Sequence, residues 1–341
     1  SKDASKLVYS SDKSGVFNIY EVNLKNNKET QLTNSEEESF FVNGYAPSTN
    51  EVFYSADKGG NENSHIYLIR NNETVDLTPG ENTKASFFGW TQDEQDMYVL
   101  SNSRDPRFFD LYKINILTLE SVMVYKNDKG YSLNSISNND KHLVLNLNLS
   151  RSEQKLFLYE IKSKQQFEIS NQTANYSGQN FDKNDENFLY TTNYDSEFYY
   201  LMSYNLNNGD RSIVYKTNWD VAFSYLSKND SFRVVAVNED AQNKIIIKNM
   251  NDQSDLNLIG LENMNINRVA FSDDEKMIRI SAGSPNSPGD IYTYNLSTNK
   301  LNKITTNLNS SVNPDDLVNA EVIRYESFVG YEMNLFKQTL L

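Results

Sequence analysis

A motif of about 45 residues recurs seven times along this chain and constrains its fold more than any other feature. Each copy opens with a polar turn cluster, and these clusters begin at positions 3, 48, 91, 137, 182, 227 and 272. A short apolar segment follows each cluster, and about ten residues later comes a second one, often an aliphatic–aromatic pair such as Ile19-Tyr20. Four short strands per repeat of this length are typical of β-propellers. The sequence therefore predicts an all-β fold, a seven-bladed β-propeller of four-stranded antiparallel blades.

Two further landmarks keep the same phase. A third apolar position recurs at Leu32, Leu77, Val124, Ile169, Val214, Ile259 and Ile304. Strand-like segments also lie between copies, at 39–45, 85–90, 219–226 and 263–271. The alternatives are a sandwich or barrel with accidental spacing, and a helical solenoid. The solenoid is disfavoured because the apolar segments are short, β-branched or aromatic, and bounded by turn residues.

The first repeat starts at the turn before its second strand, so we expect blade one to lack an inner strand within this chain. An unclosed ring leaves open strand edges. The missing strand comes either from an upstream segment or from the stretch Asn309 to Ile323. We expect residues 1–308 to form the propeller and residues 309–341 to act as a linker or closing strand.

Charge and composition exclude several classes of partner. The formal net charge is −14, which argues against nucleic-acid binding because such partners demand a basic surface. No apolar segment is long enough to cross a bilayer, and none is basic and amphipathic, so we expect no membrane partner. Cysteine is absent, which excludes disulfides and thiolate chemistry but is compatible with cytoplasm or periplasm. The N-terminal residues do not resemble a signal peptide.

Catalytic and metal-binding patterns are not found in this sequence. The G-x-S-x-G elbow of serine hydrolases does not occur, and Ser284 lies in a Pro/Gly turn between two expected strands of blade seven. The two histidines, His65 and His142, fall in strands of different blades, where a structural role is expected. They give no zinc spacing, and the acidic turns recur in every blade, which indicates turn chemistry rather than calcium sites. We expect no catalytic residue, no metal and no cofactor in this chain.

Two local features are candidates for contacts. Arg104-Asp105-Pro106-Arg107 places two guanidinium groups and a carboxylate before Phe108-Phe109. Arginine holds carboxylates by paired hydrogen bonds, so this segment could contact a substrate or another domain, or it could form an internal pair that holds a long loop. Glu36 and Glu37 lie in an acidic run between blades, where a solvated surface is the simpler interpretation.

Three segments resemble the N-terminal propeller of the prolyl oligopeptidase family of serine peptidases, in its dipeptidyl- and acylaminoacyl-peptidase branch. The general repeat is shared with TolB-like propellers and has WD40-like length. The more specific segments are 58–67 (KGGNENSHIY), 101–112 (SNSRDPRFFDLY) and 320–330 (AEVIRYESFVG), the last departing from the family pattern at Val329.

The resemblance implies a partner domain and a role. In that family an α/β-hydrolase domain carries the catalytic triad, and the propeller covers the active site and admits only short peptides. We therefore expect this chain to be the non-catalytic, substrate-gating part of such a peptidase. In the dipeptidyl branch propeller glutamates anchor the substrate amine, although Glu36 and Glu37 lie outside any helix and do not reproduce that motif. The alternative is a standalone TolB-like propeller that binds a protein partner.

Overall fold

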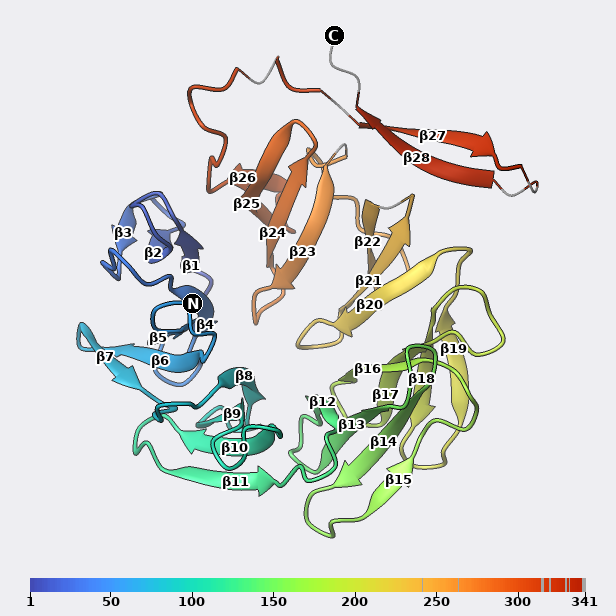
Figure 1. Cartoon of the computed structure of the whole chain (residues 1–341). Helices are drawn as coiled ribbons and strands as arrows, with labels where there is room; N and C mark the ends of the chain where they lie inside the picture. Colours follow the sequence, from blue (N-terminus) through green and yellow to red (C-terminus); the bar gives the residue numbers. More distant parts are fainter. Residues whose placement is uncertain are drawn as a thin grey trace. The chain divides into compact units, whose positions relative to one another are not determined.

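All regular elements of the described chain are β-strands. The computed structural model describes residues 1–240, 242–262, 264–313, 316–318, 320–328, 330 and 332–338. The strands form seven successive antiparallel sheets, which are the blades, and one separate two-stranded hairpin (Figure 1). Five blades have four strands, and the first and sixth have three. The chain is thus a seven-bladed β-propeller, as the repeat predicts.

The blades follow one another in chain order. Blades one to four consist of β1 (Lys6–Ser11), β2 (Asn18–Asn23) and β3 (Glu29–Gln31); β4 (Phe41–Tyr45), β5 (Val52–Ala56), β6 (His65–Arg70) and β7 (Glu73–Asp76); β8 (Ala85–Trp90), β9 (Asp96–Ser101), β10 (Asp110–Asn115) and β11 (Ser121–Tyr125); and β12 (Ser132–Ile136), β13 (His142–Asn148), β14 (Gln154–Glu160) and β15 (Gln166–Glu168). Blades five to seven consist of β16 (Tyr176–Phe181), β17 (Asn187–Thr192), β18 (Tyr200–Asn205) and β19 (Arg211–Tyr215); β20 (Asp220–Leu226), β21 (Phe232–Glu239) and β22 (Gln242–Asn249); and β23 (Asn265–Phe271), β24 (Met277–Ser284), β25 (Ser287–Asn295) and β26 (Lys300–Lys303).

The chain divides into two compact units. Unit 1 comprises Ser1–Tyr194 and Tyr204–Asp210, and unit 2 comprises Asp195–Ser203 and Arg211–Leu341. In unit 1, apolar side chains of neighbouring blades share cores, as where Val8 of blade one packs with Tyr54 of blade two. In unit 2, Val234 of blade six packs with Ile278 and Ile280 of blade seven.

The polar turn clusters have one conformation in six of the seven repeats. The residue at the same place in each of these turns is left-handed, with φ between 54° and 60°, at Ala4, Glu94, Asp140, Asp185, Asp230 and Glu275. In the turn of blade two the left-handed residue, Asn50 with φ of 56°, lies one residue nearer the following strand. Asn and Asp tolerate this conformation better than other residues with a Cβ, which explains the polar composition of the turns.

Several of these turn residues also join successive blades. Asp140 accepts a hydrogen bond from the backbone N–H of Gln92 at 3.1 Å. In unit 2, Glu275 accepts one from the N–H of Asn229 at 2.6 Å. The carboxylates of the turns therefore satisfy backbone donors of the preceding blade. The acidic residues of these turns therefore have a structural role, which agrees with the interpretation of the recurring acidic turns as turn chemistry rather than calcium sites.

A buried polar residue precedes the aliphatic–aromatic pair in three blades. Asn18, Asp110 and Asp290 are at most 1% exposed and begin or lie within the third strand from the inside. Each accepts a backbone N–H from the segment that leaves the blade, as Asn18 does from Ser35 at 2.8 Å and Asp290 from Asn307 at 2.9 Å. In each of these three blades the buried side chain thus forms a hydrogen bond with the connection that leaves the outer edge of the blade.

Blade six departs from the expected pattern. The third apolar landmark at Ile259 is 55% exposed, and Leu258 and Leu261 are buried instead. Beside β22 there is only an isolated bridge between Lys248 and Asp255, so no fourth strand forms among the described residues. The sheet of blade six therefore has three strands among the described residues, and the apolar landmark at Ile259 does not mark a buried position.

Among the described residues, the sheet of blade one contains no inner strand, as expected, since β1 occupies the place that β5 has in blade two. The C-terminal hairpin pairs β27 (Ala320–Glu326) with β28 (Glu332–Gln338) in a sheet of its own. The assignment of residues 309–341 as linker or closing strand stays a prediction, and Val329, where the family pattern breaks, lies outside the described residues.

Candidate functional site

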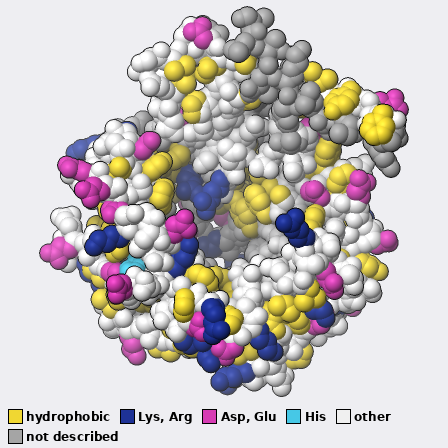
Figure 2. Space-filling model, viewed as in Figure 1, with side chains coloured by type: hydrophobic (Ala, Val, Ile, Leu, Met, Phe, Trp, Pro, Cys, Tyr) yellow, Lys and Arg dark blue, Asp and Glu magenta, His cyan; other side chains and the backbone are white. Residues whose placement is uncertain are grey.

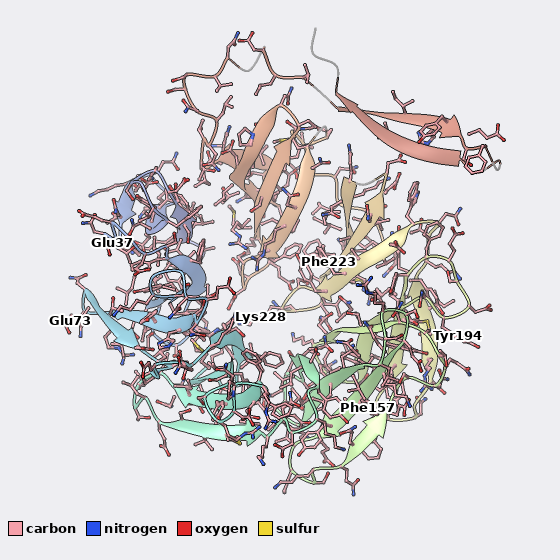
Figure 3. All side chains as sticks on the ribbon, in the orientation of Figure 1. Glu37, Glu73, Phe157, Tyr194, Phe223 and Lys228 are labelled. Atoms are coloured by element: carbon pink, nitrogen blue, oxygen red, sulfur yellow. The ribbon has the colours of Figure 1, made fainter. Side chains whose placement is uncertain are left out.

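A cleft of about 540 Å³ opens in unit 2 between β20 of blade six and β23 of blade seven. Both are the inner strands of their blades. Phe223, Tyr225 and Phe271 contribute aromatic surface to it, and Arg268 and Lys228 contribute positive charge. Figure 3 labels Phe223 on β20 and Lys228 in the turn that follows this strand. The cleft therefore combines an apolar wall with a cationic rim.

Hydrogen bonds define the shape of the cleft. The Tyr225 hydroxyl donates to the backbone carbonyl of Val269 and so bridges the two inner strands. Burial raises the pKa of Tyr225 to about 12, while the positive charges of Arg268 and Arg279 act in the opposite direction. The phenol is therefore a neutral donor at physiological pH.

Arg279 of β24 is not among the residues that line this cleft and lies on the strand behind β23. It lies opposite Ala270, which lines the cleft, and Arg268 lies opposite Ser281 on the adjacent strand. Because side chains alternate along a strand and directly opposed residues share a face, Arg268 and Arg279 lie on one face of blade seven. The bulge between Ile266 and Arg268 inserts Asn267 beside them, and bulges of this kind re-aim side chains.

The repeat shows how unusual this arginine is. In five other blades the strand pairing places an apolar, buried residue at the position of Arg279, and these residues are Val8, Phe53, Tyr98, Val144 and Val234. Each packs against the blade that comes next in the chain, as Phe53 packs with Met97. Blade seven is the last, and its copy of this position carries a charge instead of a core residue.

The two guanidinium groups are not neutralised by a carboxylate. Neither the Arg268 nor the Arg279 side chain forms an ion pair or hydrogen bond with another residue in the described part of the chain. Burial and the nearby charge of Arg268 lower the pKa of Arg279. Lys228 differs, because its Nζ lies 2.6 Å from the Asp273 carboxylate. Among the residues of unit 2 that the structure describes, Arg268 and Arg279 thus have no carboxylate partner.

The loop of blade three that contains Arg104 is stabilised by an ion pair inside the same blade. Arg104 donates from Nε and Nη2 to the buried Asp110 at 2.6 and 2.9 Å, and Asp110 also accepts the N–H of Asn127 at 2.7 Å. This pairing raises the pKa of Arg104. Asp110 bonds to the outer connection of its blade in the same way as Asn18 and Asp290. Arg104 pairs with this structural carboxylate, which agrees with the interpretation of Arg104 as part of an internal pair.

Arg107 and Asp105 form a second pair on the surface of the same loop. The guanidinium donates to both carboxylate oxygens, at 3.0 and 2.8 Å, which lowers the pKa of Asp105. The Arg107 guanidinium also lies 5.2 Å from the centre of the Phe108 ring. Its side chain is 75% exposed, so it remains accessible to an outside carboxylate. Whether this loop contacts a substrate or a domain stays a prediction.

Glu36 and Glu37 lie in the connection between blades one and two. Both are exposed, and Figure 3 labels Glu37 beside the first blade. The side chain of their neighbour Glu38, in contrast, is held by a hydrogen bond, since both its carboxylate oxygens accept the N–H of Gly59 at 2.9 Å. On the face drawn in Figure 2, acidic side chains are scattered over the surface rather than gathered in one patch. Contact roles for Glu36 and Glu37 also stay predictions.

The remaining polar candidates have structural surroundings. Nδ1 of His65 lies 2.8 Å from Asp76, and its Nε2 lies 3.0 Å from the carbonyl oxygen of Gly80. Burial lowers the pKa of His142 at the start of β13. Ser284 ends β24 at the tight connection to β25, as the sequence predicts. Among the residues with a described position, no group of three or more His, Asp or Glu could hold a metal ion. A search of the same residues found no helix long and apolar enough to span a bilayer.

Sequence reasoning missed Arg268 and Arg279. The signal was present, because Arg279 interrupts the apolar segment Ile278-Arg279-Ile280 at a place where the other repeats are apolar. The sequence does not show whether a charge in a strand is paired, and only the structure shows that these two arginines share a face without a carboxylate.

Comparison with known proteins identifies relatives by family and by fold. A sequence profile described as "Prolyl oligopeptidase, N-terminal beta-propeller domain" matches residues 33–307. A search of curated proteins found no match to the chain.

Solved structures that are similar in fold include the following three. One is a prolyl endopeptidase studied for inter-domain dynamics, with a TM-score of 0.74 and 13% identity over 97% of this chain and 52% of that chain. A puromycin-hydrolyzing peptidase of Mycobacterium tuberculosis has a TM-score of 0.72 and 8% identity, covering 98% of this chain and 57% of that one. TolB from Acinetobacter baumannii has a TM-score of 0.52 and 11% identity, covering 87% and 79%. The chain thus spans about half the length of the similar prolyl endopeptidase.

Proposed function

This chain belongs to the prolyl oligopeptidase family, as its N-terminal β-propeller domain, and on that premise we propose that it gates substrates for a serine peptidase. In this proposal the propeller does no chemistry. An α/β-hydrolase domain of the same parent protein cleaves short peptides, and the propeller excludes larger ones. The observation that carries the proposal is the family match over residues 33–307.

The described residues support a non-catalytic role. The hydrogen-bond partners of His65 are Asp76 and a backbone carbonyl, so no serine nucleophile is paired with this base. His142 begins an internal strand, and burial lowers the pKa of its imidazole. The Asp and Glu side chains of the blade turns accept backbone N–H groups, which is a structural task.

The test compares the parent protein with this chain alone. Chromogenic dipeptides and unlabelled peptides of increasing length are assayed with the parent, its nucleophile variant and the 341-residue chain. We expect turnover only by the parent, with kcat/KM falling as peptide length rises. Peptide hydrolysis by the chain alone, or no dependence of the parent on peptide length, would contradict the proposal.

We further propose the dipeptidyl- and acylaminoacyl-peptidase branch, on the strength of segments 58–67, 101–112 and 320–330. The three possible specificities respond differently to the substrate N-terminus. A dipeptidyl enzyme requires a free amine, an acylaminoacyl enzyme requires a blocked one, and an endopeptidase that cuts after an internal proline is indifferent. Cleavage only at internal proline would assign the chain to the endopeptidases and contradict the branch.

A second candidate is a protein-binding module of the TolB type. The fold similarity to TolB at a TM-score of 0.52 favours it, because propellers of one architecture serve many functions. This candidate predicts a stable complex between the purified chain and a protein from its own cell, and no peptidase activity in the parent.

A further inference from the structure

We propose that the outer edge of blade three is a surface through which two copies of this chain associate. The surface consists of Leu117, Leu119, Val122 and Met123, here called the blade-three patch. All four side chains belong to unit 1 and are between 39% and 57% exposed. The two leucines lie in the turn between β10 and β11, and the other two residues lie on β11, the outermost strand of the blade (Figure 1). The inference does not depend on the proposed gating role.

The turn of the blade-three patch differs from its copies in other blades. In five blades this turn is closed by a backbone N–H that bonds to the carbonyl oxygen four residues earlier, and the donors are Asn27, Leu119, Lys164, Gly209 and Gln253. Two places before each donor stand Lys25, Leu117, Lys162, Asn207 and Asn251. Blade three is therefore apolar at two positions where the other four blades have a polar residue or glycine.

Leu119 also has a backbone conformation that suits leucine poorly. Its φ is 64°, in the left-handed region, where a Cβ is disfavoured and glycine or asparagine is preferred. Asn27 and Gly209 are the residues at this place in blades one and five. Leu119 is 44% exposed, so burial within its own blade offsets little of this strain. A residue that stands against both local preferences indicates a function outside the blade.

The strand β11 has no charged residue to protect its edge. The outer strands β3, β7, β15, β19 and β26 each contain at least one Asp, Glu, Lys or Arg, whereas β11 has the sequence Ser-Val-Met-Val-Tyr. Charges on an edge strand discourage pairing with another chain, and an apolar edge without them favours it. A bulge in the pairing with β10 follows Met123, so the regular part of this edge is Ser121–Met123.

The charges at the two ends of β11 fit a second copy of the same strand. Glu120 precedes the strand and Lys126 follows it, and both are exposed. In a two-fold antiparallel pairing the Glu120 end of one strand lies beside the Lys126 end of the other, so that opposite charges meet at both ends. Lys126 lies 2.9 Å from Asp128, in an exposed ion pair that contributes little and is readily exchanged. A parallel pairing would instead place like charges side by side.

The size of the blade-three patch predicts a weak, reversible dimer. Stable interfaces bury about 1,200–2,000 Å² in total, and four side chains with a short strand edge supply less than this. The dimer should therefore form as the protein concentration rises, and single substitutions in the patch should change its dissociation constant.

Sedimentation velocity of the purified chain over a series of concentrations measures this association. The variants are Val122→Lys, Leu119→Asn, Glu120→Lys, Lys126→Glu and the double variant that combines the last two. Phe167→Lys is the matched control, because Phe167 is 51% exposed on β15, the outer strand of the next blade. The thermal midpoint at low concentration verifies that each variant is folded.

We expect Val122→Lys to weaken the dimer about ten-fold or more, because it places two positive charges beside each other near the two-fold axis. Leu119→Asn should also weaken the dimer, but without lowering the thermal midpoint of the monomer, since asparagine tolerates the left-handed conformation. Each charge reversal alone should weaken the dimer, and the double variant should restore it. Phe167→Lys should leave the dissociation constant unchanged.

Three results would overturn the inference. The first is a monomer at all concentrations up to about 1 mM, the weak end of the affinity scale. The second is a dimer that neither Val122→Lys nor Leu119→Asn weakens, which would place the interface elsewhere on the chain. The third is slower hydrogen exchange of residues 117–123 in a monomeric parent protein than in the monomeric chain, which would show that another part of the parent covers this edge.

Discussion

Asp185 offers a direct test of how the blade turns hold the propeller together. This left-handed residue of the blade-five turn, with φ of 55°, is 9% exposed. Its carboxylate accepts three hydrogen bonds from the blade-four turn, from the N–H of Asn138 at 2.8 Å, the Asn138 Nδ2 at 3.0 Å and the N–H of Asn139 at 2.8 Å. The substitution Asp185→Ala removes all three acceptor contacts and leaves the backbone in place.

The magnitude follows from these contacts. A hydrogen bond to a charged group contributes about 1.5–3 kcal/mol, and three that share one carboxylate are not additive. The freed donors lie in a surface turn and regain some contact with water. An alanine in the left-handed region adds about 1 kcal/mol of strain. We therefore expect Asp185→Ala to lower the free energy of unfolding by about 3–5 kcal/mol, and Asp185→Asn, which keeps one oxygen acceptor, by roughly 1 kcal/mol.

Urea unfolding followed by circular dichroism measures these differences. Asp195→Ala is the matched control, because Asp195 is also left-handed, with φ of 49°, but is exposed and forms no side-chain hydrogen bond with another described residue. It should lose only the backbone contribution, about 1 kcal/mol. A loss for Asp185→Ala no larger than that of Asp195→Ala would refute the assignment of the turn carboxylates as links between blades.

Three further predictions concern the site candidates and the pH response. Arg107→Gln should leave the thermal midpoint of the chain unchanged, because its pair with Asp105 is on the surface, and should raise the KM of the parent only if the loop contacts substrate. Glu36→Gln and Glu37→Gln, combined, should raise the parent's KM for a peptide with a free amine and not for its acetylated form; equal effects on both would exclude amine anchoring. Burial lowers the folded-state pKa of His142, so its contribution to stability is present above the unfolded-state value of about 6.5 and is lost as pH falls through the folded-state value. His142→Gln should therefore flatten the decline in stability below pH 7, measured by urea titrations at several pH values.

Much of the fold could be predicted because the blades are built from local patterns. Strands alternate with turns inside each 45-residue copy, so strand positions such as 85–90 appear in the structure as β8 with the same bounds. At Ile259 an apolar residue in the phase of the third landmark is exposed, and beside β22 only an isolated bridge forms among the described residues. The position of an apolar residue within the repeat indicates where a strand can form. Whether the strand forms depends on backbone hydrogen bonds to the edge of the neighbouring strand.

The candidate site could be predicted only in part. The loop around Arg104 was recognisable because two arginines and an aspartate stand close together in sequence. Which carboxylate each arginine takes was not, since Asp110 is six residues away and its burial depends on the blade around it. The sequence alone left the internal pair and the outside contact as alternatives.

The seven-fold period, the strand-rich blades and the polar left-handed turns were determined by the amino-acid sequence itself, because each depends on interactions within one repeat. Only the tertiary structure decided that Arg268 and Arg279 share a face of blade seven and form no ion pair with any carboxylate among the described residues. The reason is physical: the free energy of a charge depends on its neighbours in space, and those neighbours come from strands that pair across many intervening residues.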